Sequence, residues 1–337
     1  MNRPNRFQPQ LRALAFLLSI VFTATAFAQQ PQPPADDQDQ SIETLKVNVN
    51  VVNVYFNVKD KHGLLIPDLT KDDFTITEDG KPQTVKYFSK ETDQPLTLGM
   101  LIDTSGSQAR VLSIEQSVGA QFLEQVLRPK DLAFLMNFDV NVELDQDMTN
   151  NGRTLRKALN EVKINTGGGG AIGIPGIGQG PFPNRDPRGT LLYDAIFLAA
   201  DEKLKSEVGR KAMIILTDGE DQGSQEKIQT AIEAAQKSDA ICYVLLIEDR
   251  GMYNGFGAGL MKKLATETGG RVIEVGNKSD KLRDALDQIA KELRTQYFIG
   301  YAPTNQKRDG SYRKVEVKPK NSDLKIQARK GYYAPSK

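Results

Sequence analysis

Apolar and polar residues alternate with two different periods along the chain, and the change of period divides it into segments. In the first segment, residues 45–95, Val47, Val49 and Val51 alternate with asparagines, and the apolar positions continue in the opposite phase from Val52. This period of two predicts a β-strand, and the phase slip predicts a bulge near Val51 and Val52. A small all-β unit is therefore expected here. Its further strands are predicted at 74–76 and 85–88, with a turn at 78–81.

The middle segment, residues 96–294, alternates short apolar runs with stretches whose apolar residues recur every three or four positions. Strands separated by helices in this way imply an α/β fold with a doubly wound, mostly parallel sheet and helices on both faces. In such sheets ligands bind at the carboxyl ends of the strands. The predicted strands are 96–103, 131–138, 142–147, 212–216, 240–247 and 272–275, and the predicted helices are 114–127, 154–162, 191–204, 225–236, 259–266 and 281–293.

After residue 294 the period returns to two, with predicted strands at 297–301, 312–317 and 324–328. A short all-β segment of this size is too small to be stable alone. The segments 45–95 and 295–337 are therefore predicted to join into one small β-sandwich-like unit beside the α/β domain. Five tyrosines fall in the last segment, and strand positions explain them better than a sugar- or peptide-binding patch, because aromatic residues are enriched in strands. They are Tyr297, Tyr301, Tyr312, Tyr332 and Tyr333.

The first 28 residues have the pattern of an export signal. Three arginines precede an apolar run that ends in Ala26-Phe27-Ala28, as in a secretory signal peptide cleaved after Ala28. Polar residues interrupt the run, so an uncleaved membrane anchor is the weaker alternative. Residues 29–44 are rich in Gln, Pro and Asp and are predicted to be a disordered linker. No later stretch is apolar enough to cross a membrane.

Composition narrows the compartment and the class of partner. The 44 Lys and Arg residues nearly balance the 43 Asp and Glu residues, so charge gives no reason to expect a nucleic acid as partner. Cys242 is the only cysteine, which excludes an intrachain disulfide, and within an apolar run it is expected to be a small buried side chain. An exported chain without disulfides suggests a bacterial envelope, either the periplasm or the cell surface.

Oxygen-bearing side chains stand at the ends of three predicted elements. Asp103, Ser105 and Ser107 form an Asp-x-Ser-x-Ser loop after strand 96–103, Thr190 stands before a helix, and Asp218 follows strand 212–216. A hard divalent cation such as Mg²⁺ takes oxygen ligands and keeps some positions open. The sequence therefore predicts a site for Mg²⁺, or for Mn²⁺ or Ca²⁺, at these five residues.

Each fragment of this site also has an ordinary structural explanation. The Asp103 loop and Asp218-Gly219 could be hydrogen-bonded turns, and Thr190 could cap the helix that follows it. Their joint occurrence at the ends of strands and helices favours the metal site. Three nearby carboxylates are assigned instead to helix-start electrostatics and loop solvation. These are Asp194, Glu220 and Asp221.

Other kinds of chemistry find less support. His62 is the only histidine, so neither a Ser-His-Asp nor a Cys-His system can form, and an ordinary zinc site is excluded. A divalent-metal hydrolase stays open as an alternative, because aspartates after strands also serve phosphoryl transfer. The Gly-rich run 167–180 lacks the Gly-Lys-Ser/Thr ending of a phosphate loop and is expected to be a mobile loop on the metal face.

The order Asp-x-Ser-x-Ser, Thr, Asp resembles the metal-ion-dependent adhesion site of von Willebrand factor A (VWA) domains, and residues 96–294 resemble such a domain. The flanking segments contain Val-Asn-Val-Tyr-Phe-Asn-Val-Lys-Asp and Ala-Arg-Lys-Gly-Tyr-Tyr-Ala and resemble an exported VWA-related family known largely from acidobacteria. The resemblance implies that Ser105 and Ser107 bind the metal directly and Thr190 directly or through water. It implies that Asp103 and Asp218 lie close and hold the metal through bridging waters.

The resemblance and the residues lead to one expected function. A cation held by two hydroxyls and few charges has an incomplete shell that attracts an Asp or Glu carboxylate of a partner. The chain is therefore predicted to be an exported, metal-dependent protein-binding module and not an enzyme. The alternatives are a divalent-metal hydrolase and a structural envelope domain without metal-dependent binding.

Overall fold

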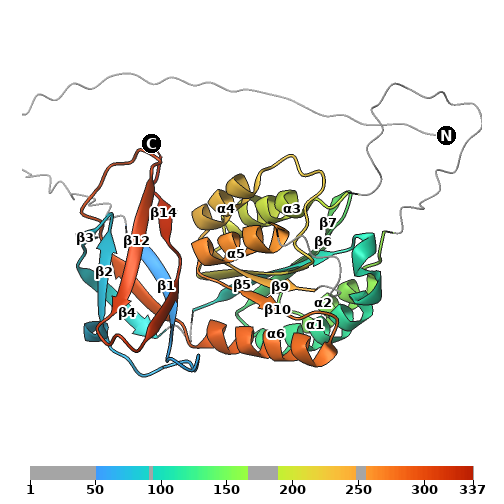
Figure 1. The fold of residues 1–337 in the computed structure, drawn as a ribbon, viewed down its shortest axis with the longest axis horizontal. Coiled ribbons are helices and arrows are strands. Elements are labelled where there is room, and N and C mark those ends of the chain that lie inside the picture. The colour runs from blue at the N-terminus through green and yellow to red at the C-terminus, as the bar shows by residue number, and fades with distance from the viewer. Residues whose placement is uncertain (1–50, 91–93, 166–188, 248–255, 337) are drawn as a thin grey trace, which may run out of the picture. The chain divides into compact units, whose positions relative to one another are not determined.

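A computed structural model describes residues 51–90, 94–165, 189–247 and 256–336 (Figure 1). The predicted signal peptide, the linker, the residues before the expected bulge and the Gly-rich run 167–180 lie outside the described residues. Among the described residues, no helix combines the length and the apolar character needed to cross a membrane.

The largest sheet has six strands in the order β10-β9-β8-β5-β6-β7. Neighbouring strands are parallel, apart from β6 and β7, which are antiparallel. Every residue of β5, β8 and β9 is buried, as expected for parallel strands covered on both faces. The strands are β5 (Leu96–Asp103), β6 (Leu132–Phe138), β7 (Val142–Thr149), β8 (Arg210–Thr217), β9 (Ala240–Leu246) and β10 (Val272–Glu274).

Helices cover both faces of this sheet, so the predicted doubly wound α/β fold is confirmed (Figure 1). On one face lie α1 (Leu112–Val126), α2 (Gly152–Glu161) and α6 (Ser279–Arg294), and on the other α3 (Leu192–Leu198), α4 (Ile228–Lys237) and α5 (Phe256–Thr268). The helix predicted at 191–204 is α-helical only as far as Leu198 and continues as a π-helical segment, η3 (Ala199–Leu204).

The two ends of the described chain build two further antiparallel sheets, with strand orders β13-β1-β11-β4 and β14-β12-β2-β3. Each sheet combines strands from before β5 with strands from after α6, as predicted, and the two sheets enclose one apolar cluster. The strands are β1 (Val52–Lys59), β2 (Phe74–Glu78), β3 (Lys81–Pro82), β4 (Val85–Lys90), β11 (Tyr297–Tyr301), β12 (Tyr312–Pro319), β13 (Lys325–Ala328) and β14 (Gly331–Tyr333).

Three of the five tyrosines singled out in the sequence belong to this cluster: Tyr297, Tyr301 and Tyr332. Tyr312 is 39% exposed and packs edge-on against Tyr333, so these two lie on the outside of the sheet. All five tyrosines thus lie on strands, as predicted, three of them in the core and two on a strand face.

A buried carboxylate on α6 ties the small sheets to the helix. Glu292 accepts hydrogen bonds from Lys59 Nζ and Arg271 Nε, both at 2.8 Å, and from Gln327 Nε2 at 3.1 Å. Two cationic groups thus compensate the charge of a side chain that is only 3% exposed.

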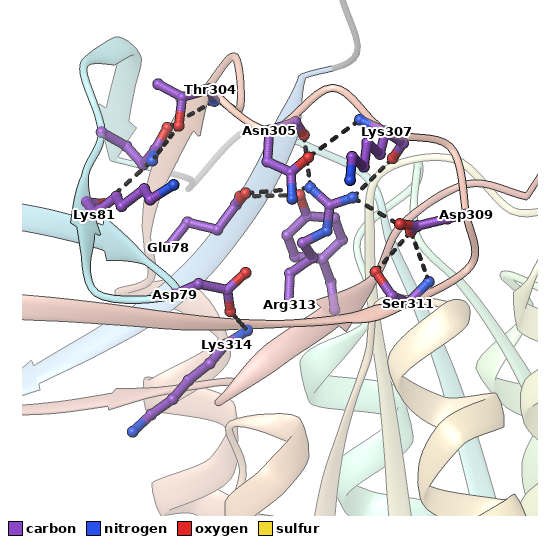
Figure 2. Close-up of polar contacts among 12 residues, drawn as sticks. Glu78, Asp79, Lys81, Thr304, Asn305, Lys307, Asp309, Ser311, Arg313 and Lys314 are labelled. Carbon is purple, nitrogen blue, oxygen red and sulfur yellow. Dashed lines mark hydrogen bonds and ion pairs between the residues drawn. The ribbon is translucent and has the colours of Figure 1, made fainter.

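A second buried ion pair lies inside the small sheets, between Arg313 on β12 and Glu78 on β2 (Figure 2). Both side chains are 1% exposed, and Arg313 Nη1 lies 3.6 Å from Glu78 Oε1. The guanidinium also donates to the carbonyl oxygens of Asn305 (2.6 Å) and Lys307 (2.8 Å). Tyr301 donates to Glu78 Oε2 at 2.8 Å. Arg313 therefore compensates the charge of Glu78 and fixes the position of the loop before β12.

Replacing Arg313 by Met is expected to destabilise the fold, because it leaves the Glu78 carboxylate buried without a cation and two loop carbonyls without a donor. Breaking a buried pair on one side costs about 3–5 kcal/mol. Urea unfolding measures the loss. The control is Lys314→Met, an exposed position on the same strand, which should change stability by less than about 0.5 kcal/mol. Equal stability of the two variants would show that the Arg313 pair contributes nothing.

Candidate metal site

The parallel pairing of β5 with β8 brings the two predicted acidic residues to one edge of the sheet. Ile102 pairs with Leu216, so Asp103 follows beside Thr217, and Asp218 comes one residue later. Asp103 is fully buried, and both of its oxygens accept hydrogen bonds. Thr217 Oγ1 donates to Oδ2 at 2.8 Å, and the Ser105 amide donates to Oδ1 at 3.0 Å. The carboxylate is therefore fixed in position.

A chain of hydrogen-bonded oxygens connects the two loops at this edge. Ser105 Oγ lies 2.9 Å from Ser107 Oγ, and Ser107 Oγ donates to Asp218 Oδ2 at 2.6 Å. Gln108, buried in the 3-10 helix η2 (Gly106–Arg110), donates to the same Asp218 oxygen at 3.1 Å. The structure thus brings together Asp103, Ser105, Ser107 and Asp218, four of the five predicted site residues.

Thr190, the fifth residue, is placed by its backbone. It exchanges two hydrogen bonds with Gln222, of 3.0 and 2.9 Å, in the loop that follows Asp218. The next amide, of Leu191, donates to the Asp139 carbonyl at 2.8 Å, and the Asp139 carboxylate accepts from Thr104 Oγ1 at 3.0 Å. Among the described residues, no hydrogen bond of Thr190 reaches the other four. The helix-cap explanation fails, since Leu191 is the N-cap residue of α3.

The turn explanations account for only part of the acidic side chains. Asp218 Oδ1 accepts from the Glu220 amide at 3.1 Å, and Gly219 has a φ of +87° that favours glycine. This turn occupies Oδ1, while Oδ2 receives the Ser107 hydroxyl. Turn formation therefore leaves unexplained why Ser107, itself bonded to Ser105, and Gln108 both donate to the second oxygen.

The nearby carboxylates Asp194 and Asp221 hold the loops together. Asp194 accepts from the amides of Gln225 (3.0 Å) and Glu226 (2.8 Å), and Asp221 accepts from the Tyr193 amide at 3.1 Å. These bonds tie the start of α3 to the loop after β8. Asp194 lies in the first turn of α3, as the helix-start prediction requires, and both residues connect the loops where only loop solvation was predicted.

A third carboxylate, which the sequence reasoning missed, lies near Asp103. Glu115 on α1 is 1% exposed, and neither of its side-chain oxygens has a hydrogen-bond partner among the described residues. Burial raises the pKa of Glu115 to about 8, and the charge of Asp103 adds to this effect. Burial and then the Asp218 charge raise the pKa of Asp103 to about 7. Three carboxyl groups therefore gather at this edge, and burial favours the protonated form of two of them, Asp103 and Glu115.

The donors present suit a hard cation. The side chains of the five predicted ligands offer only hydroxyl or carboxylate oxygens, which Mg²⁺ and Ca²⁺ prefer. The salt bridges formed by described residues include none with Asp103, Glu115 or Asp218. No cluster of three or more His, Cys, Asp or Glu in the described ranges is arranged around a metal position, because hydroxyls supply much of this set. A divalent cation would supply the missing positive charge.

A signal for Glu115 was present in the sequence, whereas Gln108 and Thr217 gave none that stood out. Glu115 precedes Val118 by three residues and Phe122 by seven, so it lies on the apolar stripe of its helix. A carboxylate on such a stripe is unusual and marks a candidate functional group.

Comparison with known proteins gives structural likeness only. No family model and no curated protein matches the chain. One similar solved structure is a conserved hypothetical protein, BatB, from Bacteroides thetaiotaomicron, with 17% identity, 59% of this chain and 97% of the other covered, and a TM-score of 0.43. Another is proximal thread matrix protein 1 from the mussel byssus with a zinc-occupied MIDAS motif, with 14% identity, 63% and 48% coverage and a TM-score of 0.47.

A third similar structure is the SpRpn10 VWA domain, with 11% identity, 57% of this chain and 94% of the other covered, and a TM-score of 0.40. At these identities and TM-scores, the likeness assigns neither a function nor a site residue to the chain.

The raised pKa of Glu115 predicts a pH dependence of stability in metal-free protein. Its carboxyl stays protonated in the folded state to about pH 8, while the unfolded chain releases the proton near the ordinary value of 4.5. The free energy of unfolding should therefore fall as pH rises between these values, by roughly 1.4 kcal/mol per pKa unit of difference at most.

Denaturant unfolding of the wild type and of Glu115→Gln, in chelator, measures this effect from pH 4 to 8.5. The variant should match the wild type most closely at pH 4 and be the more stable protein at pH 8, because an amide releases no proton. Parallel curves for the two proteins would contradict the assignment of the pH dependence to Glu115.

Proposed function

We propose that this chain is an exported, VWA-related module that binds another protein through a divalent cation, Mg²⁺ or else Mn²⁺ or Ca²⁺. Asp103, Ser105, Ser107, Thr190 and Asp218 would hold the cation. The observation that carries the proposal is the chain of oxygens from Ser105 through Ser107 to Asp218, beside the buried Asp103.

The exposure of these side chains supports binding of a partner in preference to a closed structural metal site. Asp103 is buried, Ser105 and Asp218 are half-buried, and Ser107 is exposed. A cation at the hydroxyls would face solvent on the Ser107 side. Two neutral hydroxyls leave its charge under-compensated, so an Asp or Glu carboxylate of the partner would be attracted to the open position.

The roles of the residues follow from their contacts. The hydroxyls of Ser105 and Ser107 would be direct ligands, and Thr190 a ligand directly or through water. Asp103 and Asp218 would compensate the charge, and the hydrogen bonds from Thr217 and Gln108 would keep these carboxylates aimed at the site. When bound, the cation supplies an electrophilic centre for a partner oxygen.

Binding of the metal can be tested without knowledge of the partner. Isothermal titration of chelator-treated protein with Mg²⁺ and Mn²⁺ should show one site, and Ser107→Ala should weaken it at least tenfold, about 1.4 kcal/mol. The matched control is Ser311→Ala. Ser311 follows Asp309 in a similar Asp-x-Ser turn, with an amide-to-carboxylate bond of 3.1 Å against 3.0 Å at Ser105, but it belongs to the loop before β12. Equal affinity of both variants would contradict the site.

The partner-binding role requires a second measurement. Immobilised protein should retain envelope proteins that chelator releases and that the Ser107→Ala variant fails to retain, while Ser311→Ala retains them. Phosphatase or esterase turnover that is lost in Ser107→Ala would instead establish a hydrolase. Metal binding without metal-dependent capture would leave the structural alternative.

A further inference from the structure

A groove of about 370 Å³ opens between β12 and β13. The two strands are joined by residues 320–324 but belong to different sheets, β12 beside β2 and β13 beside β1. They therefore diverge and leave one edge of the small sheets open. The lining residues come from both strands and their ends and include Lys314, Val315, Glu316, Val317, Ile326 and Lys330.

The backbone of β12 presents unused hydrogen-bonding groups to this groove. The Lys314 carbonyl accepts from the Asp79 amide, and the Lys320 amide donates to Asp73, so the even-numbered residues bond toward β2. The Val315 amide points the other way and donates to the Lys330 carbonyl at 2.8 Å. Because this direction alternates along a strand, the amide and carbonyl of Val317 also point away from β2. Neither forms a hydrogen bond with a described residue.

Exposed lysines line the groove or lie on the strands and the connection that form it. Lys314 and Lys330 line it, and Lys318, Lys320 and Lys325 are exposed on β12, on β13 or between them; these five residues are called the lysine rim. The acidic residues among them are Glu316, which pairs with Lys318 at 3.2 Å, and Asp323. Lysines at a sheet edge oppose the addition of unrelated strands. The same lysines favour a strand that carries carboxylates.

We propose that this groove binds an extended, Asp- or Glu-rich segment of a partner protein by β-strand addition along β12. The free amide and carbonyl of Val317 would bond to the backbone of the segment, and the lysine rim would pair with its carboxylates. The volume of about 370 Å³ lies near the lower end of the range for ligand pockets, roughly 300–1,000 Å³, and suits a short segment.

This binding is separate from the proposed metal site. The groove is formed by β12 and β13 of the small sheets, whereas the candidate ligands follow β5 and β8 and precede α3. It needs no cation, and it should weaken with salt because exposed ion pairs are screened. Chelator should leave it unchanged.

Fluorescence anisotropy of labelled peptides with the whole chain, in chelator, tests the proposal. The probe is a peptide of alternating Glu and Thr, compared with a Lys-Thr peptide and with the Glu-Thr peptide N-methylated on alternate amides. The acidic peptide should bind, with the N-methylated form at least tenfold weaker and the basic peptide not binding.

The charge-reversed variant Lys318→Glu/Lys330→Glu should lose at least tenfold in affinity for the acidic peptide. Lys81→Glu/Lys86→Glu, on the exposed strands β3 and β4, should bind as the wild type does.

Three results would contradict the proposed binding of an acidic segment in the groove. One is equal binding by the two charge-reversed variants. Another is self-association of Lys318→Glu/Lys330→Glu with no peptide binding by the wild type, which would show that the lysines only protect an edge. The third is binding of the peptide that needs added Mg²⁺ and is lost in Ser107→Ala, which would place the peptide at the metal site and support the proposed function alone. Circular dichroism confirms that the variants remain folded.

Discussion

The in-register parallel pairing of β5 with β8 determines the chemistry of this protein. Because Ile102 lies opposite Leu216, the buried Asp103 meets the Thr217 hydroxyl, and the loop that carries both serines meets Asp218. A slip of one residue would remove the hydroxyl from Asp103 and turn the side chains of β8 to the opposite face. Both strands are buried on both faces, and this burial fixes their register. The apolar clusters on the two faces stabilise the fold and offset the cost of burying carboxyl groups at the edge of the sheet.

The buried carboxylates of this chain differ in how the fold compensates them. Glu78 lies against Arg313, and Glu292 lies against Lys59 and Arg271, so each has a cationic partner within the protein. Asp103 and Glu115 have none among the described residues, and desolvation raises the pKa of each. The buried Asp131 and Asp139 are compensated by hydrogen bonds from amides or a hydroxyl, whereas neither side-chain oxygen of Glu115 has a hydrogen-bond partner among the described residues. An unsatisfied buried carboxyl of this kind supports the proposed cation site.

The features that could be predicted from the sequence follow from the period of its apolar positions and from the residues at the ends of its strands. Alternation by two and by three to four predicted both kinds of sheet, and the Asp-x-Ser-x-Ser loop predicted where Ser107 and Asp218 meet. Gln108 escaped prediction because its role depends on a short 3-10 helix that directs its amide to Asp218. The divergence of β12 from β13 was also hidden, since the turn that joins them resembles that of an ordinary hairpin. β13 pairs with β1 and β12 pairs with β2, so pairing with strands distant in the sequence determines which sheet each one joins.

The overall charge balance conceals two local imbalances of opposite sign. With 44 basic and 43 acidic residues, the composition gives no reason to expect a nucleic acid as partner. Yet the edge at Asp103 gathers carboxylates without basic partners among the described residues, while the lysine rim gathers five lysines around two acids. Each set of like groups is unfavourable by itself. The carboxyl groups lie beside hydroxyl oxygens that could bind a cation, and the lysines lie beside backbone groups that could bind another strand. What such a chain binds therefore depends on where its charges lie and which of them the fold leaves uncompensated, and a net charge near zero carries no information about either.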